Sequence, residues 1–239
     1  RMTMQNTPLL MSRILGRGAI LDPEVEIVTQ QADGTHRQTI KQTWDHANQV
    51  AHALKKHGIE VGDRVASFMW NNYRHLELYQ GVPSMGAVLH TLNIRLSPTD
   101  LEYIINHASD RVIFADEDLL PLLEPLWAKI PCVELLVICR HGEGGESSFE
   151  NQIDYEDFIA DQPSEFNWPE INETSPMGLC FTSGTTGKPK GVMYTNRSTY
   201  LHTLTESLTD SIGLSSLDSL LGIVPMFHAM GWGLPFAAS

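Results

Sequence analysis

The sequence has no apolar stretch long enough to cross a membrane as a helix, and residues 1–12 lack the apolar core of a secretion signal. It has only three cysteines, Cys132, Cys139 and Cys180. Three thiols cannot all pair and none forms a close C-x-x-C, so we expect free thiols in a reducing compartment. These absences predict a cytoplasmic protein without a membrane span.

Basic residues are scarce as well. Lys and Arg number 16 against 29 Asp and Glu, which gives a formal net charge of −13. This balance argues against binding to nucleic acid or to an anionic membrane surface. A polyanionic small molecule would instead need a local concentration of positive charge, and Lys188, Lys190 and Arg197 form such a cluster in the sequence.

Two common nucleotide-binding motifs are missing. The glycines at 142, 144 and 145 do not have the spacing of G-x-G-x-x-G. Gly187-Lys188 does not belong to G-x-x-x-x-G-K-[ST] either, because Thr182 and Pro189 occupy positions that this motif reserves for other residues. Pro189 also disfavours helical geometry at Lys188, so the loop does not lead into a helix.

The chain instead has one stretch rich in glycine and small hydroxyl residues, F-T-S-G-T-T-G-K-P-K-G at 181–191. Glycines let the backbone approach a ligand closely, so that successive N–H groups converge on anionic oxygens. The hydroxyl groups add donors, and the lysines add compact positive charge. We therefore predict a phosphate-binding loop between two strands. The alternative, a flexible linker, does not normally separate two apolar strand-like runs.

Strand-like and helix-like segments alternate along the chain, which is typical of an α/β fold with mostly parallel sheets flanked by helices. A loop rich in Pro and Asn at 161–176 separates a first sheet region, 1–170, from the region that contains the phosphate-binding loop, 171–239. The expected strands lie at 64–69, 87–92, 112–115, 133–138 and 191–194, and the expected helices at 73–82, 98–108 and 119–129.

Several local expectations follow from turn and capping signals. Asp33-Gly34 predicts the turn of a hairpin near the start of the chain. Thr43 is expected to cap the helix that follows. The spacing of three histidines on that helix does not put them on one face, so we interpret them as surface residues rather than a metal site. They are His46, His52 and His57. Residues 219–224 are expected to form the last strand.

The ten residues T-S-G-T-T-G-K-P-K-G at 182–191 resemble the phosphate-binding signature of the adenylate-forming superfamily, which includes acyl-CoA synthetases. A second block, V-P-M-F-H-A-M-G-W-G-L-P at 224–235, resembles the acyl-substrate motif of the fatty-acyl-CoA synthetase branch. The resemblance extends from about Leu9 to Ser239. It implies that residues 1–239 are the N-terminal portion of the AMP-binding domain, and that the rest of this domain and the C-terminal domain are absent.

The resemblance also implies roles for individual residues. The loop would bind the phosphates of ATP, with Lys190 assisting catalysis and Thr182 helping to place Mg²⁺. His228 would lie beside the carboxylate of the acid as a second catalytic residue, and Ala229, Gly231 and Trp232 would line the acid site. The residues expected to bind ATP are Thr182, Ser183, Gly184, Thr185, Thr186, Gly187, Lys188 and Lys190. The local sequence leaves alternatives open: a packed histidine, a core aromatic at Trp232, and small residues that only permit close packing.

By this resemblance, the complete protein joins a fatty acid to CoA through an acyl-adenylate, and its partners are the fatty acid, ATP and CoA. The adenine- and ribose-binding residues, the metal-binding glutamate and the C-terminal lysine of such ligases lie beyond Ser239, so we expect residues 1–239 alone to be inactive. One alternative is a ligase for another acid, such as a short sulfur-containing or an aryl carboxylate. Another is a non-catalytic nucleotide-binding module. A homodimer is possible by analogy.

Overall fold

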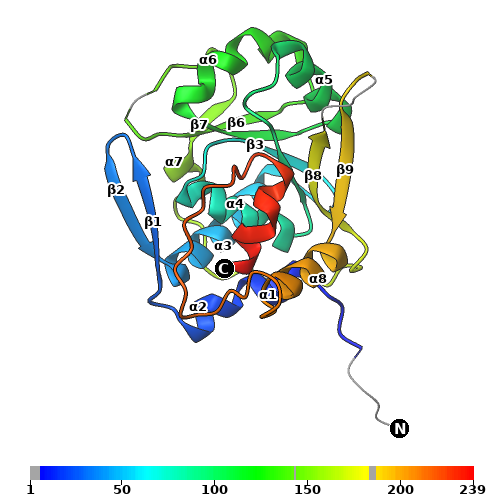
Figure 1. Cartoon of the computed structure of the whole chain (residues 1–239). Coiled ribbons are helices and arrows are strands. Elements are labelled where there is room, and N and C mark those ends of the chain that lie inside the picture. Colours follow the sequence, from blue (N-terminus) through cyan, green and yellow to red (C-terminus); the bar gives the residue numbers. More distant parts are fainter. Residues whose placement is uncertain (1–5, 143, 183–186) are drawn as a thin grey trace.

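The computed structural model describes residues 6–142, 144–182 and 187–239. Its centre is a seven-stranded sheet in the order β7-β6-β5-β3-β4-β8-β9 (Figure 1). All neighbouring strands are parallel except β9, which runs antiparallel to β8. The strands are β3 (Arg64–Phe68), β4 (Val88–Thr91), β5 (Val112–Asp116), β6 (Leu135–Cys139), β7 (Gln152–Asp154), β8 (Pro176–Thr182) and β9 (Lys190–Thr195). The predicted α/β class with a mostly parallel sheet is confirmed.

Helices cover both faces of the sheet, and the side chains of each central strand alternate between the two cores. On β5, for example, Val112 and Phe114 pack in the first core while Ile113 and Ala115 pack in the second. The first face carries α1 (Met11–Leu15), α3 (Ile40–His57), α4 (Tyr73–Ser84), α7 (Tyr155–Ile159), α8 (Asn196–Glu206) and α9 (Leu234–Ala237). The second carries α5 (Pro98–Ala108), η1 (Glu117–Leu119), α6 (Leu120–Leu123) and η2 (Glu124–Lys129).

The order of the strands reverses around β3. The chain passes from β3 through α4 to β4 on one side, and then through α5 to β5 on the other side of β3. Because α4 and α5 lie on opposite faces, the connections that leave β3 and β4 diverge. Parallel α/β sheets characteristically bind ligands where connections diverge in this way, and we call this region, at the carboxyl ends of β3 and β4, the crevice.

A two-stranded hairpin, β1 (Glu26–Gln31) and β2 (Gly34–Thr39), packs beside the main sheet (Figure 1). The hairpin was predicted, but its two turn residues are Ala32 and Asp33, and Gly34 pairs with Gln31. The next helix, α3, begins one turn earlier than expected, because Thr39 rather than Thr43 is its cap. Thr39 accepts a hydrogen bond from the Gln42 N–H while the Gln42 side chain accepts one from the Thr39 N–H.

Two predicted elements differ from the structure. Residues 219–224 form no strand: in the part of the chain that the structure describes, no strand pairs with them, and Leu221 and Ile223 are exposed. A strand needs a partner to satisfy its backbone groups, and periodicity alone cannot supply one. The helix expected at 119–129 is divided into η1, α6 and η2, since Pro121 and Pro125 each remove an N–H donor within it.

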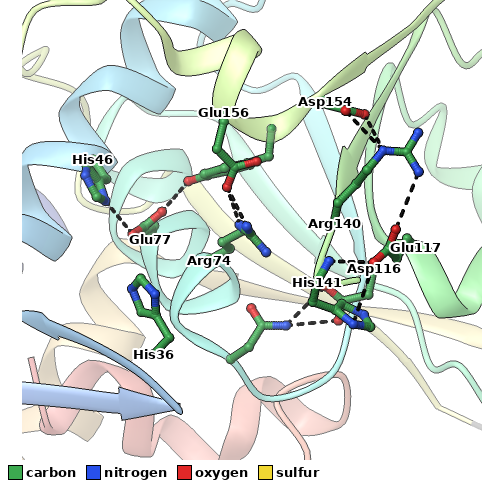
Figure 2. Close-up of polar contacts among 12 residues, drawn as sticks. His36, His46, Arg74, Glu77, Asp116, Glu117, Arg140, His141, Asp154 and Glu156 are labelled. Atoms are coloured by element: carbon green, nitrogen blue, oxygen red, sulfur yellow. Dashed lines mark hydrogen bonds and ion pairs between the residues drawn. The ribbon is translucent and has the colours of Figure 1, made fainter. Parts of the chain in front are cut away.

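The three histidines on α3 are each only partly exposed, and His46 contacts a buried carboxylate. The Nδ1 atom of His46 lies 2.8 Å from Oε1 of Glu77, a fully buried carboxylate on α4. Figure 2 shows the contact between His46 and Glu77. This carboxylate also accepts hydrogen bonds from Gln38 and Tyr155. The hydrogen bond to Glu77 raises the pKa of His46, against the opposing effect of burial. His46 is therefore partly buried and ties α3 to α4, although 37% of its side chain still reaches the surface.

Among the helices in the described residues, none combines the length and the apolar character that crossing a membrane requires.

His75 on α4 gives a testable pH dependence of stability. Its Nδ1 donates a hydrogen bond to the Trp70 carbonyl at 2.9 Å. In a neutral ring the other nitrogen, Nε2, carries no proton, and it accepts a hydrogen bond from the Ser67 hydroxyl at 2.9 Å. Burial lowers its pKa from 6.5 to about 4. Below pH 6.5 the unfolded chain takes up a proton that the folded chain does not, so stability falls as the pH drops through this window, by at most about 1.4 kcal/mol per pH unit.

We therefore expect the free energy of unfolding to fall less steeply between pH 6.5 and 4 in His75→Gln than in the unsubstituted protein. Urea unfolding at several pH values measures this slope. Asp116, whose pKa is raised to about 7 by burial, acts in the opposite direction, but it is present in both proteins and cancels in the difference. Parallel pH profiles would contradict the assignment of a neutral, buried His75.

Candidate functional site at the carboxyl edge of the sheet

Four strands deliver their following residues to one edge of the sheet. Because β3, β4, β5 and β8 are parallel, their carboxyl ends lie together. Residues 70–72 follow β3, residues 92–97 follow β4, and the glycine-rich loop follows β8. We call residues 182–191 the phosphate loop and residues 224–235 the acyl motif. The structure brings both to this edge.

The two ends of the phosphate loop are joined as a β ladder. Thr182 on β8 is the register partner of Lys190 on β9, and its Oγ1 lies 3.5 Å from the Lys190 carbonyl oxygen. Both residues are exposed, as are Gly187 and Lys188. Gly187 has φ +151°, and a Cβ added there would meet nothing within 4 Å, so the backbone is open to a ligand. The remaining predicted ATP-binding residues lie outside the described residues: Ser183, Gly184, Thr185 and Thr186.

Lys188 lies against α5. Its Nζ is 4.8 Å from the centroid of the Tyr103 ring, which is within the range of a cation–π contact. A cavity of about 550 Å³ opens here between α5 and the end of the phosphate loop, and Asp100 and His107 help to line it. Arg197, which the sequence grouped with the two lysines, instead forms an ion pair with Glu173 at 2.8 Å. The positive charge available at the loop therefore comes from Lys188 and Lys190.

The acyl motif enters the crevice between β3 and β4 through Phe227. This side chain is buried, with its ring 6.3 Å from the Trp70 ring in an edge-on arrangement and 5.6 Å from the Arg95 guanidinium. Trp70 follows β3 and Arg95 follows β4, so Phe227 occupies the point where the strand order reverses. The next residue, His228, is exposed, and its N–H donates to the Pro225 carbonyl at 3.1 Å.

The backbone after His228 is strained. Five consecutive residues have positive φ and form a left-handed turn, η3 (Ala229–Gly233). Three of the five have side chains: Ala229 at φ 48°, Met230 at φ 52° and Trp232 at φ 58°. Each non-glycine residue in this region costs about 1–2 kcal/mol, and such strain concentrates at functional sites. Gly231 is buried, whereas Trp232 is 64% exposed and is not a core aromatic in this chain.

The left-handed turn packs directly against the strand that opens into the phosphate loop. The Met230 side chain covers Gly178 on β8, where an added Cβ would lie only 3.0 Å from the Met230 methyl carbon. Burial raises the pKa of the Cys180 thiol, and this effect is partly offset by its hydrogen bond with the Thr91 hydroxyl and by the N–H groups of Met230 and Ala229. Cys180 precedes Thr182 by two residues, so the acyl motif and the phosphate loop are neighbours in space.

Sequence reasoning missed the polar residues that follow β3 and β5 at this edge. Asn71 and Asn72 follow β3 after Met69 and Trp70, and Asp116 ends β5. A tandem pair of asparagines at the carboxyl end of a buried strand, opposite an acid at the end of the neighbouring strand, is a signal that could have identified them. Their contacts tie the acyl motif to the sheet.

Comparison with known families agrees with this geometry. The sequence model described as AMP-binding enzyme matches residues 19–239. The chain belongs to the AMP-binding enzyme family.

Similar proteins in this family are acyl-CoA ligases. The chain is 40% identical to the 3-methylmercaptopropionyl-CoA ligase of Ruegeria pomeroyi, a match that covers 99% of this chain and 44% of that protein. It is 37% identical to the medium-chain-fatty-acid–CoA ligase of Ectopseudomonas oleovorans, again over 99% of this chain and 44% of the relative. The chain therefore spans less than half the length of these curated relatives.

Solved structures of adenylate-forming enzymes share the fold. The crystal structure of the anthranilate CoA ligase AuaEII in complex with anthranoyl-AMP superposes with a TM-score of 0.77 at 26% identity. The match covers 99% of this chain and 45% of that one. The parallel sheet and its flanking helices are thus those of the N-terminal domain of this family.

The left-handed turn leads to a stability prediction. Gly233 has φ +83°, and a Cβ there would lie 2.7 Å from Nδ1 of His202 and 2.9 Å from Oε2 of Glu206, both on α8. We expect Gly233→Ala to lower the free energy of unfolding by about 1–3 kcal/mol, because it adds a clash to an unfavourable backbone conformation. Urea unfolding measures the change.

Gly222→Ala is the matched control, since a Cβ at Gly222 would meet nothing within 4 Å. This substitution should change the free energy of unfolding by less than about 0.5 kcal/mol. Equal effects of the two substitutions would show that Gly233 is not required for packing of the turn under α8.

Proposed function

We propose that the protein containing this chain is a fatty-acyl-CoA ligase, which activates a fatty acid with ATP and transfers the acyl group to CoA. The observation that carries this proposal is the packing of Met230, in the acyl motif, on Gly178 of β8, the strand that leads into the phosphate loop. An acid held at the acyl motif and an ATP held at the phosphate loop would therefore lie side by side. Membership of the AMP-binding enzyme family supports the same reaction class.

In the first step, a carboxylate oxygen of the acid attacks the α-phosphorus of ATP. A new P–O bond forms, the bond from the α-phosphorus to the bridging oxygen breaks, and pyrophosphate leaves with the bonding electrons. In the second step the thiolate of CoA attacks the acyl carbon and AMP departs. The first step brings an anion to a polyanion, so catalysis depends on alignment and on neutralising charge.

The described residues suit that demand. Lys188 and Lys190 place two exposed cations at the end of the β8–β9 ladder, and the exposed Thr182 hydroxyl offers an oxygen ligand of the kind that Mg²⁺ accepts. Mg²⁺ bound with ATP would neutralise phosphate charge and orient the leaving pyrophosphate. We propose that the two lysines bind the phosphates of ATP and that Lys190 also assists the reaction.

The acyl motif supplies the other half of the site. We propose that His228 contacts the carboxylate of the acid. This residue is exposed and lies between the buried Phe227 and the left-handed turn. Ala229 and Gly231 leave room beside the turn, and we assign Trp232 to the entrance of the acid site. The location of the protein in the cytoplasm and its assembly as a homodimer stay predictions.

A second candidate is a ligase for a different carboxylic acid. The 40% identity to a 3-methylmercaptopropionyl-CoA ligase slightly exceeds the 37% identity to a medium-chain-fatty-acid–CoA ligase. A pocket lined by small residues selects the acyl chain of its acid by shape and hydrophobicity. Because one methylene group changes the binding free energy by only about 1–3 kcal/mol, such a pocket discriminates weakly between similar acids. Direct comparison of acids therefore separates the two.

We expect the full-length protein to catalyse ATP–pyrophosphate exchange that depends on a medium- or long-chain fatty acid. Parallel assays with 3-methylmercaptopropionate and anthranilate test the second candidate. We expect residues 1–239 alone to catalyse neither this exchange nor thioester formation, because the chain spans 44% of its relatives. Exchange with none of these acids would favour a non-catalytic nucleotide-binding module, and acid-dependent exchange by residues 1–239 would refute the expected inactivity.

Two substitutions in the full-length enzyme test the assigned roles. His228→Ala should lower kcat about 100-fold or more, as expected for loss of a group that contacts the reacting carboxylate. Lys190→Gln should raise the KM for ATP about tenfold through loss of one charge contact. The controls are His52→Ala on α3, which bonds the Glu165 carbonyl, and Lys41→Gln, which pairs with Asp45. Losses of equal size in the controls would refute these roles.

A further inference from the structure

The segment that leads into the acyl motif, residues 222–226, has no regular secondary structure. It lies outside the seven-stranded sheet, and both Ile223 within it and Leu221 just before it are exposed. Yet the residues that follow are placed closely, since Phe227 is buried in the crevice at the edge of the sheet. Contacts other than a β ladder must therefore fix the path of this segment.

One side chain makes three hydrogen bonds to that path. The Nδ2 of Asn71 donates to the carbonyl oxygens of Gly222 at 2.9 Å and Val224 at 2.8 Å. Its Oδ1 accepts from the Met226 N–H at 2.7 Å. The side chain thus donates two hydrogen bonds and accepts one, each to every second residue of the same backbone segment. This combination needs a carboxamide, because only that group carries two N–H donors and an acceptor oxygen side by side. The Tyr79 hydroxyl adds a fourth bond, to the Met226 carbonyl at 2.5 Å.

Asn71 is itself held rigidly from both sides. The carboxylate of Asp116, at the end of β5, is buried and accepts a hydrogen bond from the Trp70 N–H at 2.8 Å. Both of its oxygens also accept from the side-chain amide of Asn72, at 2.9 and 3.1 Å. Asn72 also caps α4 by accepting from the His75 N–H at 2.9 Å. Figure 2 shows Asp116 at this edge with Glu117 and His141. The residues on either side of Asn71 are therefore anchored to the neighbouring strand.

We propose that Asn71 is a positioning residue for the acid site: it fixes residues 222–226 against the sheet so that Phe227 enters the crevice and His228 faces the reacting carboxylate. This inference rests on the proposed function. The same segment forms one wall of a cavity of about 340 Å³, which β1, Leu76 on α4 and Leu234 on α9 also line. Loss of the Asn71 contacts would therefore free residues 222–226 to move, both where they line this cavity and where they lead to His228.

The kinetic test uses Asn71→Ala and Asn71→Asp in the full-length enzyme. Aspartate keeps the size and the acceptor but loses both donors and places negative charge against two carbonyl oxygens. We expect the KM for the acid to rise and kcat to fall, each about tenfold or more, while the KM for ATP changes less than about twofold. Equal changes in the acid and ATP parameters would show a merely structural role and overturn the proposal.

Asn151→Ala is the matched control. Asn151 also donates its amide to a backbone carbonyl, that of Glu134, but it lies just before β7, whose amino end is at the opposite edge of the sheet. Its loss should leave both KM values within about twofold of the unsubstituted enzyme. If Asn71→Ala fails to fold, Tyr79→Phe removes a single hydrogen bond from the same segment and should produce a smaller change of the same kind.

Hydrogen exchange tests the clamp without depending on catalysis. Amides in a peptide that covers residues 222–228 should exchange about tenfold faster or more in Asn71→Ala, and at an unchanged rate in Asn151→Ala. Unchanged exchange in Asn71→Ala overturns the inference whatever the activity. If the unsubstituted enzyme shows no acid-dependent ATP–pyrophosphate exchange, the proposed function fails, and so does the role of Asn71 in the acid site. Faster amide hydrogen exchange in Asn71→Ala would even then show that Asn71 holds residues 222–226 in place.

Discussion

The pairing of β8 alongside β4 determines where both halves of the candidate site lie. Leu89 pairs with Gly178 and His90 with Leu179, so β8 points its carboxyl end, and the phosphate loop, toward the crevice. His90 also bonds Asp110, just beyond α5, at 2.7 Å, and both side chains are fully buried. Phe181 packs on the His90 ring at 5.2 Å. Removing one partner of a buried hydrogen bond leaves the other unsatisfied, which costs about 1–3 kcal/mol, so this contact ties β4 to the end of α5.

Much of the fold could be predicted because its signals are local. Ser97 is followed by Pro98 and Asp100, which is a local signal for the start of a helix, and it caps α5 by accepting from the Asp100 N–H. Gly58 is a local signal for the end of a helix, and it ends α3 in the left-handed conformation. The errors involve partners distant in sequence. Residues 219–224 have strand-like periodicity but no partner, and His46 looks like a surface residue until Glu77, 31 positions away, is placed beside it.

The candidate site divides in the same way. The phosphate loop and the acyl motif could be found from their residues, since glycines, hydroxyls and lysines in one order carry the chemistry themselves. The position of Asn71 at the end of a strand could have been noticed, but its role could not, because its partners lie about 150 residues further along the chain and none of them is a side chain. A backbone carbonyl leaves no trace in composition or spacing. Residues that position a site are thus harder to predict than those that act in it.

The left-handed turn explains why so many contacts converge on the acyl motif. Three non-glycine residues with positive φ together cost about 3–6 kcal/mol, a large part of the stability of a typical domain. Met230 packed on Gly178, Gly233 fitted against α8, and Asn71 holding the preceding segment each come from a different element, and together they offset this strain. The strained turn persists because the surrounding elements leave it no relaxed alternative, and this same constraint holds the acyl motif against β8, the strand that leads into the phosphate loop.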